Sequence, residues 1–415
     1  MTVGRLAAID AQNYWMSAVL PNDQFLLYAF GGPAGDLDHA LHPIRDRARS
    51  CPEFGLRITD TGAWAYPVWT AGPVADDQFV VHRLPDPTWQ RVLAAVAGLA
   101  DQQLDPRLTA WRLHVFDGVE VPGVGVGTVA VLQISHALGD GVRASALAAH
   151  LFGRVAPIPT VPVTHPGPGE FVRRAVAAAH AHRRLVRDTD AGLVPPPAGS
   201  RPALRSNARP DGARELRTLS RARLPGPTVT VAALSAISAA LAGHLRELGE
   251  DVSLLGAEVP MAKAGTRRAN NHFGNVTVGL YPQADRAERS RRIDADLHAR
   301  RRRAAHPAMA AESTVFAALP APLLRWGIRK FDPAARSPTV SGNTVVSSVN
   351  RGAADLWFGT APVALTAGPP ALSPMMGLTH GVHGVGDTVT ITVHAAESAI
   401  GDIDAYVQRL DRELG

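Results

Sequence analysis

His136 and Asp140 carry the residue types and the spacing that acid–base chemistry needs, in the stretch ISHALGDG. An imidazole with an unperturbed pKa of about 6.5 takes up or releases a proton near neutral pH. Asp140 directly precedes a helical pattern, which is a natural N-cap position. Gly139 and Gly141 permit a tight turn and a close backbone approach. The stretch therefore predicts an active-site loop in which His136 handles the proton and Asp140 gives structural support.

The elements around this stretch are expected to place it at the rim of a core. Residues 123–134, GVGVGTVAVLQI, are apolar on both faces and predict a strand inside a sheet, and residues 142–153 predict a helix. Ligands favour the carboxyl ends of such strands. A purely structural histidine at the end of a strand remains the alternative for His136. The same His-x-x-x-Asp spacing recurs in a predicted helix (His42/Asp46), a proline-containing loop (His82/Asp86) and a predicted hairpin turn (His383/Asp387).

The chain of 415 residues is too long for one small core. Strand and helix patterns alternate over residues 1–153, which predicts a first α/β domain carrying the His136 stretch. Proline, arginine and alanine dominate residues 154–227, which predict a crossover linker with a helix inside it. Residues 228–415 return to strands and helices and predict a second α/β domain.

The composition limits the classes of partner. The formal net charge is +5 and comes almost wholly from arginine, with lysine only at Lys263 and Lys330. The densest basic run, Arg300 to Arg303, has no aromatic neighbour, so nucleic acid is not an expected partner. The phosphates of coenzyme A and anionic lipid surfaces match a basic chain better. The chain has a single cysteine and no HExxH pair, so no metal site is expected. It also lacks a convincing GxSxG motif, so a serine hydrolase is not expected.

The chain shows no secretory signal and no convincing membrane span, which predicts a cytoplasmic protein. The most apolar stretch, Thr228 to Leu245, is rich in alanine, serine and threonine. We interpret it as a strand end followed by a buried helix rather than as a bilayer helix. Peripheral contact with a membrane or lipid-droplet surface stays open.

Four stretches together resemble one known family. The stretch SHALGDG is similar to the HHxxxDG motif of coenzyme A-dependent acyltransferases. Further similar stretches are RLAAIDAQNYW near the start, NNHFGNVTVGLYP from Asn270 to Pro282, and the segment from Gly377 to Leu414 at the end. Within the superfamily the chain most resembles the bacterial wax ester synthase/diacylglycerol acyltransferases, over most of its length and in the same order.

The resemblance implies a fold and a mechanism. The expected fold is two chloramphenicol-acetyltransferase-like α/β sandwich domains with a channel between them, and His136 midway along it. Acyl-CoA enters as co-substrate from one side and an alcohol acceptor from the other, with no permanently bound cofactor. His136 removes the hydroxyl proton while the oxygen attacks the thioester directly, and then protonates the leaving thiolate.

The resemblance also supplies candidate residues and shows departures from the family pattern. Ser135 stands where the family has its first histidine, and the stretch after Thr228 lacks the Asn-Asp that the family carries there. The candidate oxyanion donors are Ser347, Ser348 and Asn350, in a loosely kept TNVPG-like stretch. Asn271 is a candidate contact with the acceptor, and Asn275 is expected to shape the channel wall. Gly141 belongs to the catalytic motif itself.

These features leave three functions open. The leading one is an O-acyltransferase that moves a fatty acyl group to a lipid alcohol such as diacylglycerol or a long-chain alcohol, with triacylglycerol or wax ester as product. Ser135 and the short chain favour instead a natural-product or condensation-type acyltransferase, with another alcohol or amine as acceptor or an acyl carrier protein as donor. A non-catalytic relative is the third reading, against which the intact His136, Asp140 and Gly141 argue.

Overall fold

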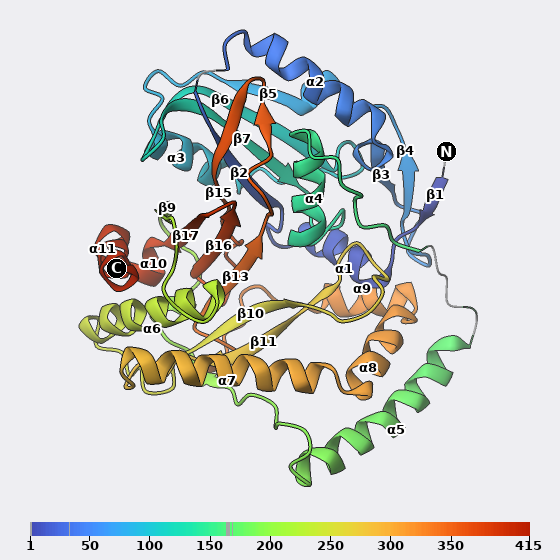
Figure 1. The fold of residues 1–415 in the computed structure, drawn as a ribbon. Helices are drawn as coiled ribbons and strands as arrows, with labels where there is room; N and C mark the ends of the chain where they lie inside the picture. The colour runs from blue at the N-terminus through green and yellow to red at the C-terminus, as the bar shows by residue number, and fades with distance from the viewer. Residues whose placement is uncertain (1, 33, 163–166, 168) are drawn as a thin grey trace.

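The computed structural model describes residues 2–32, 34–162, 167 and 169–415, and two six-stranded mixed sheets form its framework (Figure 1). The first sheet has the strand order β14-β15-β2-β7-β6-β5. Its strands are β14 (Trp357–Phe358), β15 (Ala361–Ala367), β2 (Gln24–Gly31), β7 (Gly125–Ile134), β6 (Trp111–Val121) and β5 (Phe79–His82). Only the β5–β6 pair is parallel among these neighbours.

The centre of the first sheet is apolar on both faces, as the sequence predicts for β7. Residues of β2 alternate between two cores: Leu26 and Tyr28 pack in one cluster, and Phe25 and Leu27 pack in another. Successive side chains of a strand point to opposite faces, so a continuously apolar strand requires cover on both sides. This burial fixes β7, and with it the position at which the chain leaves the sheet towards His136.

The second sheet has the order β11-β10-β13-β16-β17-β9. Its strands are β11 (Phe273–Gly279), β10 (Gly256–Ala262), β13 (Thr344–Asn350), β16 (Leu378–Val385), β17 (Thr388–Ala396) and β9 (Arg214–Arg221). The strand β13 runs parallel to both of its neighbours. The hairpin between β16 and β17 turns at Gly386 and Asp387, as predicted.

The two sheets do not follow the division of the chain expected from its sequence. The strand β9 lies inside the predicted crossover 154–227, yet it pairs with β17 of the second sheet. The strands β14 and β15 lie inside the predicted second domain 228–415, yet β15 pairs with β2 of the first sheet. The second half of the chain therefore contributes β14 and β15 to the first sheet, and the predicted linker contributes β9 to the second; Figure 1 shows β15 beside β2.

Helices cover the sheets, and several begin where the sequence supplies a capping side chain. Asp36, Asp140, Thr228 and Asp402 each accept backbone N–H groups at the start of a helix. The helix predicted around His42 and Asp46 spans residues 37–50, and the end of the chain forms a helix over residues 403–414. The helices are α1 (Ala8–Ser17), α2 (Leu37–Ser50), α3 (Trp89–Leu99), α4 (Gly141–Leu151), α5 (Glu170–Asp190), α6 (Val229–Glu247), α7 (Arg286–Ala304), α8 (Pro307–Ala317), α9 (Ala321–Arg329), α10 (Glu397–Ile400) and α11 (Ile403–Leu414).

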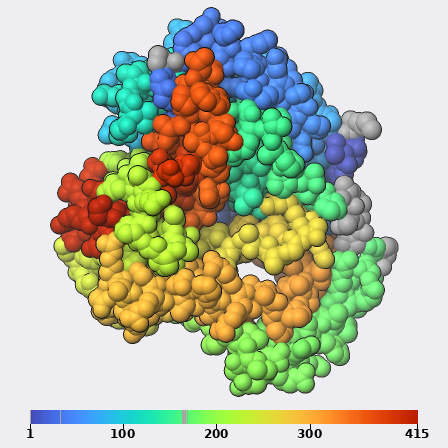
Figure 2. All heavy atoms as spheres, in the orientation of Figure 1, coloured from blue at the N-terminus to red at the C-terminus, as the bar shows by residue number. Residues whose placement is uncertain are grey.

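Short elements complete the described chain. The strands β1 (Thr2–Arg5), β4 (Val68–Ala71) and β3 (Leu56–Thr59) form a small sheet, and β12 (Thr339–Val340) pairs with β8 (Arg201–Pro202). Three 3-10 turns are η1 (Pro52–Gly55), η2 (Asp76–Gln78) and η3 (Arg205–Asn207). Figure 2 shows an opening between the yellow β10–β11 region and the orange helices α7 and α8. The channel expected with His136 midway along it remains a prediction.

The helix α6 is the one helix of the described residues with the length and composition to cross a membrane, and most of it is buried inside the protein. Its residues pack in the core of the second half, against β10, β16 and α11 among others. The predicted strand end at Thr228 is wrong. The Thr228 hydroxyl accepts the N–H of Val231 at 3.2 Å, and this cap lets the helix begin directly at Val229.

Candidate active site

His136 stands in the short loop that joins the end of β7 to the start of α4. The backbone fixes this loop on both sides. The N–H of Ser135 donates to the carbonyl of Ala110 at 2.8 Å, and the N–H of Leu138 donates to the carbonyl of Ser135 at 2.9 Å. Ser135 itself is buried. The loop is therefore a tight, buried turn at the carboxyl end of an interior strand, where the sequence placed it.

The His136 imidazole is held in a state that can accept a proton. Burial lowers its pKa below the ordinary value of 6.5, against the opposing effects of its own backbone carbonyl, the Asn271 amide and the Asp140 charge. The ring stacks on Phe273 of β11, with ring centroids 5.8 Å apart. Its Nδ1 atom is buried and has no hydrogen-bond partner among the described residues. A neutral imidazole at pH 7 has the protonation state that a general base requires.

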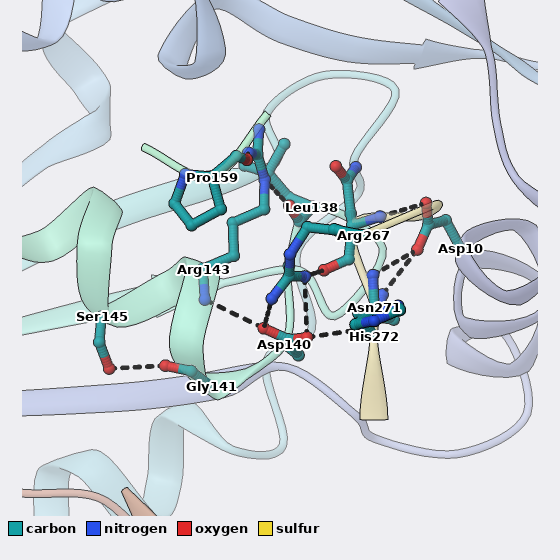
Figure 3. Close-up of polar contacts among 12 residues, drawn as sticks. Asp10, Leu138, Asp140, Gly141, Arg143, Ser145, Pro159, Arg267, Asn271 and His272 are labelled. Atoms are coloured by element: carbon teal, nitrogen blue, oxygen red, sulfur yellow. Dashed lines mark hydrogen bonds and ion pairs between the residues drawn. The ribbon is translucent and has the colours of Figure 1, made fainter. Parts of the chain in front are cut away.

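Asp140 is the N-cap of α4 and the centre of a polar network (Figure 3). Its carboxylate accepts the backbone N–H of Arg143 at 3.0 Å and that of His272 at 2.8 Å. It also forms an ion pair with Arg267 over 2.9 Å, in which both partners are largely buried. Burial alone would raise the pKa of Asp140, but Arg267 and the two backbone donors outweigh it and lower that pKa. Through these contacts Asp140 joins the start of α4 to the segment that carries Arg267 and His272, which is the arrangement of a residue that braces a loop.

Asn270 and Asn271 tie the second half of the chain to the His136 loop. The Asn271 amide nitrogen donates to the carbonyl of His136 at 2.7 Å, and the Asn270 amide nitrogen donates to the carbonyl of Ala137 at 3.2 Å. Asn271, predicted as an acceptor contact, thus lies beside the His136 loop, and its amide nitrogen donates to His136 and Asp10.

A buried carboxylate from the start of the chain completes this arrangement. Asp10 of α1 accepts the backbone N–H groups of Asn270 and Asn271 and the side-chain amide of Asn271, each at 2.9 Å. Burial raises the pKa of Asp10 to about 7, against the lowering effect of these donors. Asp10 of α1 therefore fixes the two asparagines that bind the His136 loop, and Figure 3 shows its carboxylate facing the Asn271 side chain.

The predicted oxyanion residues lie on β13, whose end approaches the start of α4. A Cβ added at Gly141 would lie 3.3 Å from Cγ2 of Val349, which shows how closely this side chain packs against the start of α4. The Ser348 hydroxyl oxygen accepts a hydrogen bond from Thr230 of α6 at 2.9 Å, so its own proton remains for another acceptor. Ser347 is the partly buried residue before it on the strand.

Two other predicted site residues make only local contacts. The Asn350 oxygen accepts the N–H of Gly352 at 2.9 Å, in a turn. Asn275 is exposed on the edge strand β11, where its amide lies 3.4 Å from Glu258. Within the part of the chain that the structure describes, neither side chain forms a hydrogen bond with the His136 loop. Among the described residues, no cluster of three or more histidine, cysteine or carboxylate side chains is placed to hold a metal ion.

The sequence missed several residues that build this site. Arg267 lies in the loop after β10, and nothing in its neighbourhood distinguishes it from Arg268. Asp10 falls inside the stretch RLAAIDAQNYW, and Asn270 begins the stretch NNHFGN. The resemblance therefore singled out both segments, but it did not show that these two residues hold the His136 loop. Thr230 lies two residues after the capping residue of α6. Its hydrogen bond to Ser348 forms only when β13 packs against this helix, so the sequence does not indicate it.

The two sheets and their helices form the chloramphenicol-acetyltransferase-like fold, and the solved structures agree on this fold. The chain matches the wax ester synthase/diacylglycerol acyltransferase from Marinobacter aquaeolei VT8 with a TM-score of 0.61 and 17% identity, over 99% of this chain and 98% of that one. The starter condensation domain of rhizomide synthetase, in complex with C8-CoA and Leu-SNAC, gives a TM-score of 0.56 and 14% identity over 99% and 93%. The trichothecene 15-O-acetyltransferase from Fusarium sporotrichioides matches with a TM-score of 0.57 and 12% identity, over 99% of this chain and 93% of that one.

The family follows from its two sequence models. The wax ester synthase/diacylglycerol acyltransferase catalytic domain matches residues 25–215, and the C-terminal domain of the same family matches residues 269–415. The chain belongs to the wax ester synthase/diacylglycerol acyltransferase family and is an acyl-CoA-dependent acyltransferase. No curated protein matches its sequence.

Proposed function

We propose that this enzyme transfers a fatty acyl group from acyl-CoA to the hydroxyl of a lipid alcohol, diacylglycerol or a long-chain alcohol, with His136 as the general base. The observation that carries the proposal is the position of His136 at the end of β7, in a loop whose carbonyls accept hydrogen bonds from Asn270 and Asn271, where burial lowers the pKa of the imidazole. The name of the family supports the lipid acceptor.

The reaction we propose is a direct attack without an acyl-enzyme. The hydroxyl oxygen of the acceptor forms a bond to the thioester carbon while His136 takes the hydroxyl proton. The tetrahedral oxyanion needs donors, and the free hydroxyl proton of Ser348 is the best-supported one because Thr230 already donates to its oxygen. Collapse breaks the carbon–sulfur bond, and the imidazolium returns its proton to the coenzyme A thiolate. Acyl-CoA is a co-substrate in this scheme, and no cofactor stays bound.

Thiol release tests the proposal. Wild type, His136→Ala and the control His298→Ala, which changes an exposed histidine of α7, are assayed with acyl-CoAs of short to long chain. Each acyl-CoA is crossed with diacylglycerol and with long-chain alcohols. The expected result is acceptor-dependent release that falls by about 10²- to 10⁴-fold in His136→Ala only. Equal activity of wild type and His136→Ala would refute the general base.

A second function is supported by one departure from the family pattern. Ser135 replaces the first histidine of the motif and is buried beside the loop, and the chain also matches a condensation domain and a natural-product acetyltransferase in fold. These observations favour a different alcohol or amine acceptor, or an acyl carrier protein as donor. The absence of acceptor-dependent thiol release with every lipid acceptor would favour this second function over the first. Contact with a membrane or lipid-droplet surface belongs to the first function alone.

A further inference from the structure

Arg351 is a buried arginine at the end of the strand that carries the predicted oxyanion residues. It directly follows β13, and its backbone N–H donates to the carbonyl of Gly384 of β16 at 2.8 Å, so its backbone belongs to the second sheet. Among the described residues no carboxylate pairs with its guanidinium, and its Nε atom is buried without a hydrogen-bond partner. Burial of an unpaired charge is unfavourable, so this position needs an explanation.

The side chain of Arg351 crosses to the first sheet. Its Nη1 atom donates to the carbonyl of Ala367 at 3.0 Å, to that of Leu27 at 3.3 Å, and to the Thr366 hydroxyl. The Thr366 hydroxyl in turn donates to the Leu27 carbonyl at 2.7 Å. The guanidinium carbon lies 5.1 Å from the centre of the Tyr28 ring. A residue of the second sheet is therefore held by β2 and β15 of the first sheet.

These contacts connect β13 to the strand that positions His136. The strand β2 pairs with β7, and Leu27 lies opposite Val131, five residues before His136. On the other side of the contact, Ser348 lies three residues before Arg351, about 10 Å along an extended strand. Arg351 thus joins the strand of the oxyanion candidate to the strand that leads to the general base.

The other contacts of β13 with the first half are of a different kind. Val349 packs against the start of α4 near Gly141, but an apolar contact has no preferred direction and permits small shifts along the strand. The hydrogen bonds of Arg351 are directional, and they reach two strands at once. The network of Arg267, Asn270 and Asn271 fixes the His136 loop, whereas Arg351 fixes the end of β13.

We propose that Arg351 is a positioning residue that sets the distance between the Ser348 hydroxyl and the His136 imidazole. The inference rests on the proposed function, in which Ser348 donates to the oxyanion. Such a donor acts only when it is held about 2.7–3.1 Å from the oxyanion, and a displacement of about 1 Å can lower the rate about 10²-fold. A buried charge contributes little net stability, which agrees with a role in geometry. Arg351 itself does not touch the substrate in this account.

A double-mutant cycle in kcat tests the proposal. Arg351→Met keeps much of the side-chain length and removes the donors. We expect it to lower kcat by about 10- to 100-fold with little change in the KM for acyl-CoA. In the Ser348→Ala background the same substitution should change kcat by less than about twofold, because the donor that Arg351 positions is already gone. A residue with a merely structural role would lower kcat by the same factor in both backgrounds.

Arg289 of α7 supplies the matched control. It is also buried, its Nε atom also has no partner among the described residues, and it donates to the carbonyls of Ser235 at 3.2 Å and Ala284 at 2.8 Å. Both acceptors belong to the second half of the chain. Arg289→Met therefore removes a similar guanidinium but leaves the contact between the halves intact. It should lower the midpoint of thermal unfolding, as Arg351→Met does, and keep kcat within about twofold of wild type.

Thr366→Val is a milder variant that serves if Arg351→Met does not fold. It keeps the shape of the side chain and removes the hydroxyl that joins Arg351 to the Leu27 carbonyl. We expect kcat to fall by about twofold to tenfold, the value of one hydrogen bond. The Ser348→Ala background should again abolish this loss.

The assay is thiol release from decanoyl-CoA with the best acceptor of the panel above. Where no acceptor of the panel is used, slow release by water serves, because attack of water on the thioester forms the same oxyanion. Equal kcat losses in Arg351→Met and Arg289→Met, equal factors in the two backgrounds, or a Ser348→Ala variant with the kcat of wild type would overturn the proposal. Wild-type activity of His136→Ala would instead refute the proposed function, and the coupling between Arg351 and Ser348 would still be measurable.

Discussion

Arg267 is the residue whose removal tests most directly how the catalytic loop is held. Its guanidinium pairs with Asp140 over 2.9 Å and donates to the carbonyl of Asn270 at 2.6 Å. Arg267→Met keeps much of the side-chain volume but leaves the Asp140 carboxylate buried without its counter-charge. Breaking a buried ion pair from one side costs about 3–5 kcal/mol. Asp140 keeps the N–H groups of Arg143 and His272, so we expect a loss near the lower end, about 3 kcal/mol.

The pH dependence of this loss identifies its cause. The folded-state pKa of Asp140 lies below its unfolded value, so the group contributes stability above the unfolded pKa, and this contribution is lost as the pH falls through the folded pKa. Without Arg267, burial would raise that pKa, and protonation near pH 4 would relieve the unpaired charge. The destabilisation by Arg267→Met should therefore be largest at pH 7 and should shrink towards pH 4.

Urea unfolding of wild type, Arg267→Met and Arg302→Met at pH 7 and pH 4 measures these differences. Arg302 is exposed on α7, so its substitution should change the free energy of unfolding by no more than about 0.5 kcal/mol. Because Arg267 also orders Asn270, kcat should fall in Arg267→Met while the KM for acyl-CoA changes little. A loss equal to that of Arg302→Met, or a loss independent of pH, would refute this account of the loop.

Three further predictions concern the same network. Ser348→Ala should lower kcat by about 10²- to 10³-fold if Ser348 is an oxyanion donor, and Thr230→Val, which leaves the Ser348 hydroxyl in place, should have the smaller effect in the same thiol-release assay. The pKa of Asp10 is raised to about 7 in the folded chain, so the free energy of unfolding of wild type should fall as the pH rises from 5 to 8. In Asp10→Asn this fall, measured by urea unfolding, should be smaller by about 2–3 kcal/mol. The same pH dependence of the free energy of unfolding in both proteins would contradict it. Gly141→Ala should cost about 1 kcal/mol of stability through its contact with Val349, measured by the same unfolding, and an unchanged midpoint would show that β13 can move away.

The parts of the structure that local sequence dictates were predictable. The helices at residues 37–50 and 403–414 have apolar periods and aspartate caps, and β7 is a continuous apolar run, so short-range chemistry determines each of them. The valine- and threonine-rich start of α6 misled the prediction because β-branched residues favour strands. There the Thr228 cap and the core around α6 outweigh that preference.

The support of the candidate site could not be predicted because it is assembled over long distances in the chain. Asp10 contacts residues about 260 positions away, and Arg267 contacts Asp140 across 127 positions. Neither residue has a local pattern that marks it. The pairing of β15 with β2 in the first sheet is also a long-range contact, and nothing in the sequence APVALTA predicts β2 as the neighbouring strand.

The placement of these long-range contacts bears on how the enzyme works. Asp140 and Asp10 anchor the segment from Arg267 to Asn271, and the amides of Asn271 and Asn270 bind the carbonyls of His136 and Ala137. A general base is effective only when its nitrogen is held within hydrogen-bond reach of the substrate proton. The loop belongs to the first half of the chain, whereas Arg267, Asn270 and Asn271 belong to the second. The geometry of His136 therefore depends on the contact between the two halves, and a change that loosens this contact should lower kcat before it unfolds either half.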